Sequence, residues 1–475
     1  MRRAAEWCER LDMLLRRLVV PILVLVGLFL AVRFAAAPIA RPALGYLAKV
    51  TCSQVFVGGL SPEAAVAELP DLVVTRAIRT TVDVPSGRVR ASIPGVITRE
   101  AVHHAGLGCT LVPAEGEMVA FPAIPPPPPA AADVAALPWP RGDRVEPQAP
   151  VGVDGARLAA ALDRAFAEPH PRGRRNTRAV VVAHRGRIIA ERYAEGFGPE
   201  TRFPGWSMTK SVGSALVGVL VAEGKLSLDS ASLFPAWRGE EDPRRRITLG
   251  QLMWMSDGLA HDESYDPTGG ATRLLFGARD IAATAAATPS RSEPGSTWYY
   301  ASAASNLIAQ LVRGAVGGTL TDYLTFPRRV LFDRIGMQSA VMEPDATGLF
   351  VTSSFMYATA RDWARFGQLY LQDGVWHGER ILPAGWVRYS VTPAPAAMVG
   401  EYGAQWWLNA GAAKDTAHRP FPKVPREFYR AAGFEGQLVG VVPSAELVVV
   451  RLGLSRPDQA FDPGELMADV LAAVR

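Results

Sequence analysis

Five consecutive prolines, Pro125–Pro129, constrain more than any other feature how this chain of 475 residues can fold. Proline has no backbone N–H and a fixed φ, so such a run fits neither a helix interior nor a central strand. It favours an extended polyproline conformation. We therefore interpret the proline-rich residues 121–150 as a semi-rigid linker. The linker separates an N-terminal part from a large domain, residues 151–475, long enough for one catalytic unit.

An apolar run without a charged residue, Leu18–Val32, lies near the N-terminus. Continued through Arg33, it approaches the roughly 20 residues that span a bilayer. More arginines precede the run than follow it, which by the positive-inside rule places the N-terminus in the cytoplasm and everything after the run in the periplasm. We therefore predict that residues 1–45 are a cytoplasmic tip and a single-pass transmembrane anchor in the inner membrane. The alternative is a cleaved signal peptide, although Pro38 would follow the cleavage site at Ala35-Ala36-Ala37.

The chain has three cysteines, and two of them, Cys52 and Cys109, follow the predicted anchor. Disulfides persist outside the cytoplasm, so we predict a bridge between these two. The sequence contains no CxxC pair and no His/Cys cluster with zinc-ligand spacing. Its net charge of +4 is small and its arginines are scattered. We therefore expect no metal, no organic cofactor and no nucleic-acid partner.

Residues 46–120 have the pattern of a small α+β segment. Ser61-Pro62-Glu63 is typical of a helix start, with serine as the N-cap and proline in the first turn. Two alternating runs, Thr81–Val84 and Arg88–Ala91, flank Pro85-Ser86-Gly87 and predict a β-hairpin.

The large domain has an α/β (α+β) pattern. Helices are predicted over residues 154–166 and from about Pro463. Hairpins are predicted near both ends of the domain, at Ala179–Ala183 with Ile188–Tyr193 and at Leu438–Val442 with Leu447–Leu452. Because the middle of the domain is rich in helical patterns, we expect one antiparallel sheet flanked by helices, with an all-helical subdomain.

Ser207 and Lys210 stand three residues apart at a predicted helix start. Residues i and i+3 share a helix face, so the ammonium can reach the hydroxyl. A serine hydroxyl is a weak nucleophile until a neighbour takes its proton, and burial can lower the pKa of a lysine enough for that role. By itself, Ser-x-x-Lys also fits a helix N-cap with a solvated lysine. The helix that follows consists of small and apolar residues, which is typical of a buried helix.

Further landmarks follow in order between Ala179 and Gly453. They are Met255-Ser256-Asp257-Gly258-Leu259, Pro294-Gly295-Ser296-Thr297-Trp298-Tyr299-Tyr300, Ala360-Arg361-Asp362-Trp363, Tyr402-Gly403-Ala404-Gln405-Trp406-Trp407 and Gly433-Phe434-Glu435-Gly436-Gln437. With Ser207-Met208-Thr209-Lys210, this series resembles the family of serine β-lactamases, penicillin-binding DD-peptidases and related esterases. Within that family it is most similar to the 6-aminohexanoate-dimer (nylon-oligomer) hydrolase branch. The resemblance implies a β-lactamase/DD-peptidase-like fold.

The resemblance also implies roles for single residues. Tyr300 matches the tyrosine of the family's Tyr-x-Asn motif and is expected to be the acid/base partner of Lys210. Ser302 stands in the third position of this motif, where it is expected to contribute to substrate binding. Tyr299, one residue earlier, is the rival tyrosine, and Ser305-Asn306 is an alternative alignment of the motif.

The family's third motif, a Lys-Thr-Gly or His-x-Gly strand, matches Phe434-Glu435-Gly436. Gly436 is expected to let substrate approach the strand, and Gln437 to donate the second oxyanion-hole N–H beside that of Ser207. Phe434 replaces the cation that binds a substrate carboxylate in lactamases. The resemblance therefore favours a neutral ester or amide over β-lactams and D-Ala-D-Ala peptides.

A polar stretch between the first two motifs contains Glu263 and Tyr265, which the resemblance places at the substrate; a solvated polar loop is the alternative. The predicted function is a serine hydrolase that cleaves a small-molecule or peptide-like ester or amide through an acyl-enzyme on Ser207. Either Lys210 or Tyr300 is the base. The alternative functions are a cell-wall DD-carboxypeptidase or β-lactamase, and a non-catalytic envelope ligand-binding protein of the same fold.

Overall fold

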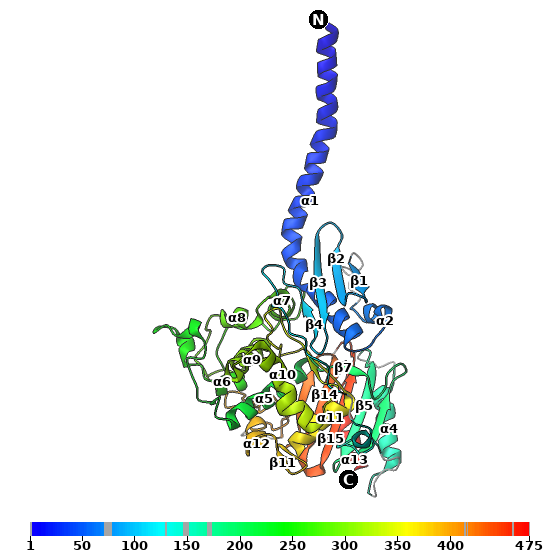
Figure 1. The fold of residues 1–475 in the computed structure, drawn as a ribbon, viewed down its shortest axis with the longest axis vertical. Helices are drawn as coiled ribbons and strands as arrows, with labels where there is room; N and C mark the ends of the chain where they lie inside the picture. Colours follow the sequence, from blue (N-terminus) through cyan, green and yellow to red (C-terminus); the bar gives the residue numbers. More distant parts are fainter. Residues whose placement is uncertain are drawn as a thin grey trace.

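The computed structural model describes residues 2–70, 78–128, 131–145, 152–168, 173–412, 415, 417–457 and 460–474. Its centre is a six-stranded antiparallel sheet in the order β12-β13-β14-β15-β5-β6 (Figure 1). The strands are β5 (Thr177–His184), β6 (Arg187–Tyr193), β12 (Trp407–Leu408), β13 (Tyr429–Gly433), β14 (Gln437–Val442) and β15 (Leu447–Gly453). Both predicted hairpins, β5–β6 and β14–β15, are confirmed, and β15 joins them by pairing with β5.

Side chains of β15 alternate between two buried layers, as the two-residue period of a strand requires. Leu447 and Val449 pack under helices α4 (Gly155–Phe166) and α13 (Pro463–Ala473), whereas Val448 and Val450 belong to the larger core on the opposite face. Helix α11 (Ala360–Leu371) covers that second face. The prediction of an antiparallel sheet flanked by helices is confirmed.

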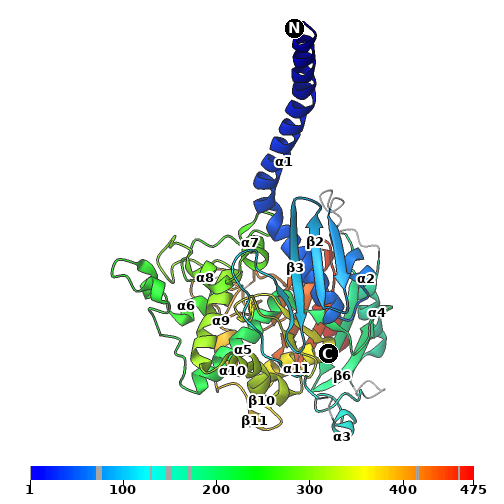
Figure 2. The same ribbon diagram turned by 45° about the horizontal axis from the view of Figure 1, so that its top comes forward.

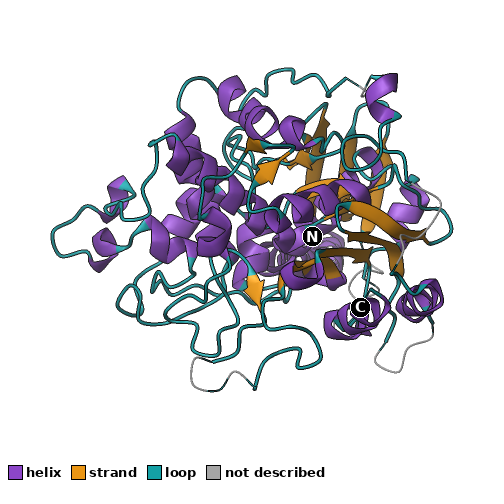
Figure 3. Ribbon diagram, turned by 90° about the horizontal axis from the view of Figure 1, so that it is seen from below, coloured by secondary structure: helices purple, strands orange, loops and turns teal. Residues whose placement is uncertain are grey.

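A helical region lies beside the sheet (Figure 3). Its helices are α5 (Thr209–Ala222), α6 (Leu249–Met253), α7 (Gly270–Gly277), α8 (Ile281–Ala286), α9 (Ser302–Val316), α10 (Leu320–Pro327) and α12 (Trp386–Ser390). Short strands form two further small sheets. One has the order β7-β9-β8, with β7 (Arg202–Pro204), β8 (Val341–Met342) and β9 (Met356–Thr359), and the other pairs β10 (Val375–Trp376) with β11 (Glu379–Arg380). Helix α5 is buried along almost its whole length, so the Ser207–Lys210 motif stands at the start of a core helix.

The N-terminal part consists of the long helix α1 (Arg2–Phe56), the short helix α2 (Pro62–Ala67) and a four-stranded antiparallel sheet. The strands are β1 (Arg79–Asp83), β2 (Arg88–Ile93), β3 (Ile97–His104) and β4 (Gly108–Leu111). Ser61 caps α2 and β1 pairs with β2, which confirms both local predictions. The C-terminal end of α1 packs on this sheet at the edge of the catalytic unit (Figure 2).

The other end of α1 projects away from the rest of the molecule (Figure 1). Leu18 and Leu23 are exposed on it. In the described part of the chain, no helix has a stretch both long enough and apolar enough to cross a bilayer. The transmembrane anchor predicted within residues 1–45 is therefore not supported in that part of the chain.

The predicted linker lies against the catalytic unit and contains the short helix α3 (Ala132–Ala135). Trp139 is almost fully buried, and the Arg365 guanidinium donates to the carbonyl oxygens of Pro140 and Gly142 at 3.0 and 2.7 Å. Residues 129–130 and 146–150 of this stretch lie outside the described residues. Trp139 and Gly142 thus pack against the domain, whereas Pro125, Pro126 and Pro128 are exposed, and the role of the stretch as a linker stays a prediction.

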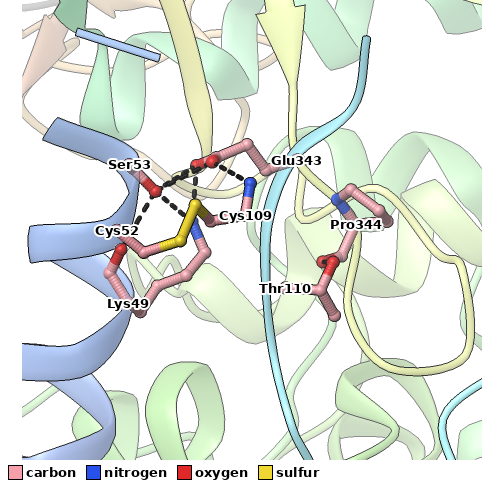
Figure 4. The surroundings of a disulfide bond; sticks show 7 residues. All are labelled: Lys49, Cys52, Ser53, Cys109, Thr110, Glu343 and Pro344. Carbon is pink, nitrogen blue, oxygen red and sulfur yellow. Dashed lines mark hydrogen bonds and ion pairs between the residues drawn. A yellow bond between two sulfur atoms is a disulfide. The ribbon is translucent and has the colours of Figure 1, made fainter. Parts of the chain in front are cut away.

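A buried cluster fastens the N-terminal part to the catalytic unit (Figure 4). The structure has a disulfide between Cys52 of α1 and Cys109 of β4, the pair that the sequence suggested. Next to it, the fully buried Glu343 accepts hydrogen bonds from the Ser53 hydroxyl at 2.8 Å and the Cys109 N–H at 2.7 Å, and it forms an ion pair with Lys49. Because Glu343 belongs to the catalytic unit, one carboxylate holds both α1 and β4 in place.

Candidate active site

Ser207 lies in a strained turn between β7 and α5. The preceding Trp206 has a φ of +47°, a conformation that side chains with a Cβ rarely adopt. The Thr209 hydroxyl holds this turn by donating to the Trp206 carbonyl oxygen at 2.7 Å. Ser207 itself is half-buried, and it stands at the N-terminal end of the 14-residue helix α5. The helix dipole therefore favours negative charge at this position.

Lys210 is the nearest base to Ser207. Its Nζ lies 3.0 Å from the Ser207 Oγ, and it also contacts the Ser353 carbonyl oxygen at 2.9 Å and the Ser302 Oγ at 3.3 Å. Burial lowers the pKa of Lys210 to about 8, although the Glu263 carboxylate acts in the opposite direction. A lysine with this pKa is partly neutral near pH 7 and can accept the serine proton.

Tyr300 stands beside both groups. Its ring centroid lies 4.8 Å from the Lys210 Nζ, and its hydroxyl is near enough to Ser207 for that serine to lower the pKa of Tyr300. Burial raises the pKa of Tyr300, the Glu263 charge raises it further, and the hydrogen bond with Ser207 opposes the change. Tyr300 therefore stays protonated where Lys210 is already neutral. The rival Tyr299 faces elsewhere, because its hydroxyl accepts the Glu263 backbone N–H at 3.2 Å.

Glu263, Tyr265 and Ser302 form one hydrogen-bonded group next to Lys210. Glu263 accepts from the Ser302 N–H at 2.7 Å, from the Ser302 hydroxyl at 2.6 Å and from the Tyr265 hydroxyl at 2.5 Å. The Ser302 hydroxyl thus lies between the Glu263 carboxylate and the Lys210 ammonium. The Tyr265 ring is stacked on Phe434 at 6.5 Å between centroids. The structure brings all these predicted residues together.

In the hairpin turn after β13, the glycine that lies against the turn of Ser207 is not the one that the sequence predicted. A Cβ on Gly433 would lie 2.2 Å from the Gly205 carbonyl oxygen, so Gly433 is the glycine pressed against the nucleophile's turn. Gly436, predicted to face the substrate, instead faces the interior, where a Cβ would meet Arg451 at 2.5 Å. Gln437 begins β14 opposite Gly433. This part of the site is therefore shifted by three residues, and Phe434 is the residue that follows the close-approach glycine.

The side chain of Gln437 is hydrogen-bonded to backbone groups of the hairpin turn and of β15. Its Nε2 donates to the carbonyl oxygens of Phe434 at 3.0 Å and Gly453 at 2.7 Å, and its Oε1 accepts the Gly453 N–H. These bonds tie the hairpin turn to β15. Gln437 thus fixes the backbone of Phe434, whose ring contacts Trp206 edge-on at 5.7 Å between centroids.

Two contributors to the site were not expected from the sequence. Ser353 presents its carbonyl oxygen to Lys210, and Asn306 holds the Ser353 loop through bonds of 3.0 and 3.3 Å. The alternative motif alignment, Ser305-Asn306, therefore lies next to the site, and Asn306 positions Lys210 only through its hydrogen bonds to Ser353. The second is α1, whose Tyr46 ring lies parallel to Trp206 at 6.4 Å. No pattern in the sequence links α1 to the motif around Ser207.

The described residues contain no group of three or more His, Cys, Asp or Glu side chains that could hold a metal ion.

Comparison with known proteins assigns the family. The family described as Beta-lactamase matches residues 156–473, which is more than half of the chain. The chain belongs to the Beta-lactamase family. This result agrees with the serine-hydrolase landmarks found in the sequence. Helix α1 and its small sheet lie outside the residues that the family matches.

Individual relatives are distant from this Beta-lactamase family member. A 6-aminohexanoate-dimer hydrolase from Paenarthrobacter ureafaciens is 26% identical over 307 residues, covering 59% of this chain and 73% of the relative. A penicillin-binding protein homologue from Caulobacter crescentus superposes with a TM-score of 0.52 at 16% identity, covering 69% and 99% of the two chains. A Bacillus anthracis protein described as a 6-aminohexanoate-dimer hydrolase gives 0.51 at 22% identity, covering 69% and 86%. At these identities the structural matches establish the fold alone.

Proposed function

We propose that this protein hydrolyses a neutral ester or amide through an acyl-enzyme on Ser207. The observation that carries the proposal is the 3.0 Å contact between the Ser207 Oγ and a buried lysine whose pKa is about 8. A serine beside a base of this kind is an activated nucleophile. The 6-aminohexanoate-dimer hydrolase from Paenarthrobacter ureafaciens is consistent with an amide or ester substrate.

In the proposed first half-reaction, neutral Lys210 accepts the Ser207 proton while the Oγ bonds to the carbonyl carbon. The backbone N–H groups of Ser207 and Phe434 donate to the oxyanion, a role that we move from Gln437 to Phe434 because Gly433 is the glycine at the nucleophile. When the C–O or C–N bond breaks, Tyr300 donates its proton to the leaving group and takes the proton that Lys210 received from Ser207. In the second half-reaction neutral Lys210 accepts a proton from the attacking water and returns it to the Ser207 Oγ, which releases the acid and restores the site.

The assignment of Lys210 as base and Tyr300 as acid rests on their opposite responses to burial. Burial lowers the pKa of the lysine and raises that of the tyrosine, because in each case it disfavours the charged form. Around and above pH 8 the pair therefore holds one proton acceptor, Lys210, and one proton donor, Tyr300, beside Ser207.

A penicillin or D-Ala-D-Ala substrate is the second candidate, and one feature argues against it. The family's cation stands two residues before the glycine of the third motif. Ala431 and Ala432 precede Gly433, and Phe434 and Glu435 precede Gly436, so the cation's position is Ala431 or Phe434 and is uncharged in both alignments. A substrate carboxylate would lack the positive partner that lactamases provide. A neutral acyl group fits the position better.

The test uses two activity-based probes on the full chain. We expect a fluorophosphonate to label the wild type and not Ser207→Ala, with Ser444→Ala, an exposed serine on the β14–β15 turn, as the matched control. Labelling by fluorescent penicillin that disappears in Ser207→Ala would instead establish the cell-wall activity. If neither probe labels the wild type, the protein is the non-catalytic ligand-binding module.

We also propose that the catalytic unit works outside the cytoplasm. The disulfide between Cys52 and Cys109 supports this, because such bonds persist mainly in oxidising compartments. Thiol alkylation of the protein in freshly lysed cells, before any oxidation, should leave both cysteines unmodified. Alkylation of both would contradict the proposal.

A further inference from the structure

The catalytic serine opens onto a large apolar pocket. The pocket has a volume of about 480 Å³, within the usual range for small-molecule sites, and Ser207 lies on its wall. Phe434 and Trp206 flank the serine, and Leu275 and Phe276 of α7 form the opposite side. None of the described residues that line it is an Asp, Glu, Lys or Arg.

One wall of this pocket comes from α1. Ala43, Tyr46 and Leu47 line it, and Ile93 of β2 extends the wall beyond the helix. The Tyr46 ring lies parallel to Trp206 and packs edge-on against Phe276 at 5.2 Å, so aromatic rings continue from α1 to the nucleophile's turn. These wall residues precede the part of the chain that the Beta-lactamase family matches, residues 156–473.

The wall is held rigidly. A Cβ on Gly45 would lie 2.1 Å from the Phe276 carbonyl oxygen, so α1 and α7 approach as closely as a glycine allows. One to two turns further along α1, the disulfide at Cys52 and the ion pair of Lys49 with Glu343 fix the helix to β4 and to the catalytic unit (Figure 4). The pocket is therefore preformed, which reduces the entropy lost on binding.

Tyr300 indicates which half of a substrate enters the pocket. Its ring centroid lies 4.8 Å from the Lys210 Nζ, which contacts the Ser207 Oγ at 3.0 Å. The same ring packs against Trp407 at 5.0 Å and Tyr402 at 5.8 Å, and these three aromatic residues do not line the apolar pocket. The leaving group must meet the proton donor, so it lies on the Tyr300 side of the serine. The acyl chain then lies on the other side, toward α1.

We propose that the pocket between α1, α7 and Phe434 binds the apolar acyl chain of an ester, so that α1 sets the acyl-chain specificity of the enzyme. This rests on the proposed serine-hydrolase function. In the reaction the acyl carbonyl carbon bonds to the Ser207 Oγ, the ester C–O bond breaks, and the alcohol leaves with the proton from Tyr300. The uncharged, apolar lining excludes an ammonium or carboxylate at the far end of the acyl chain.

The first test is a chain-length series of p-nitrophenyl acetate, butyrate, hexanoate and octanoate with the full chain. Each methylene that enters the pocket should raise kcat/KM by about four-fold. Ala43→Phe fills the pocket from α1 and should collapse the octanoate-to-acetate ratio, and the smaller Ala43→Leu should lower it less. Ala64→Phe, an exposed alanine on α2, is the matched control and should keep the wild-type ratio. A flat series, or an equal effect of Ala64→Phe, overturns the proposal.

A binding measurement separates the pocket from the chemistry. N-phenyl-1-naphthylamine, a neutral apolar fluorophore, should bind wild type and Ser207→Ala with similar affinity and bind Ala43→Phe at least ten-fold more weakly. Binding without hydrolysis of any ester would keep the pocket and refute the proposed function. Ser207-dependent hydrolysis without chain-length preference would support the proposed serine-hydrolase function and refute the proposed role of the pocket. Failure of the probe to bind would also refute the role of the pocket.

Discussion

The pH dependence of hydrolysis tests the assignment of Lys210 as the base. Because its pKa is about 8, the neutral form is about one-tenth of the total at pH 7 and about one-hundredth at pH 6. If neutral Lys210 is required, kcat/KM should rise about ten-fold per pH unit from 6 to 7 and level off above 8. Tyr300 has a raised pKa, so no descending limb is expected below pH 10.

Removing one charge should move this profile in a defined direction. The Glu263 carboxylate shares the Ser302 hydroxyl with the Lys210 ammonium, at 2.6 and 3.3 Å, and it raises the pKa of Lys210. Glu263→Gln keeps an oxygen for the hydrogen bond and removes the charge, so the ammonium loses its stabilising partner. The midpoint of the profile should therefore move to lower pH. Glu195→Gln, an exposed glutamate, is the control and should keep the wild-type midpoint.

The assay is initial-rate hydrolysis of p-nitrophenyl butyrate between pH 5.5 and 10, followed at the isosbestic wavelength of p-nitrophenol and corrected for spontaneous hydrolysis. The profile of kcat/KM reports groups of the free enzyme. A rate independent of pH between 6 and 8 would refute Lys210 as the base. A midpoint that moves to higher pH in Glu263→Gln would refute the electrostatic reasoning.

Three further predictions follow from named contacts. Tyr300→Phe should lower kcat about 10²-fold or more for an alkyl ester but less for a p-nitrophenyl ester, whose leaving group needs no proton; equal losses would contradict its role as the acid. Glu343→Ala leaves Lys49 buried without its partner and should lower the free energy of unfolding by about 3–5 kcal/mol in urea titrations. The double variant Lys49→Met with Glu343→Met leaves no unpaired charge and should lower it less. A larger loss in the double variant would contradict this prediction. Cys52→Ser removes the disulfide to Cys109, which closes a loop of 57 residues, and should lower the free energy of unfolding by about 4 kcal/mol by chain entropy. Urea titrations measure this loss, and reduced wild type should be as unstable as the variant.

Local patterns predicted the elements of the fold well. The Ser61 cap, the hairpins and the helix at Pro463 each depend on residues close together in the chain, and the structure contains all of them. The pairing of Ser207 with Lys210 is of the same kind, because helical geometry alone brings i and i+3 together. The transmembrane prediction depended on hydropathy over a run of marginal length, and the described structure does not support it.

The remaining parts of the site depend on contacts between distant residues. Tyr299 and Tyr300 are adjacent, and only the packing of the Glu263 loop determines which hydroxyl reaches Ser207. Gly433 and Gly436 fit the third motif equally well in the sequence, and only the hairpin turn decides which one presses on Gly205.

By itself, the sequence predicted the Beta-lactamase-type framework and the candidate nucleophile Ser207, because both depend on short-range spacing and on the order of the motifs. Only the tertiary structure decided the depth of burial that lowers the pKa of Lys210, the register of the strand beside Ser207, and the use of α1 as a pocket wall. The physical reason is that burial and close approach are set by segments far apart in the chain. Nothing in the sequence around Ala43 or around Ser207 indicates that the two residues line the same pocket.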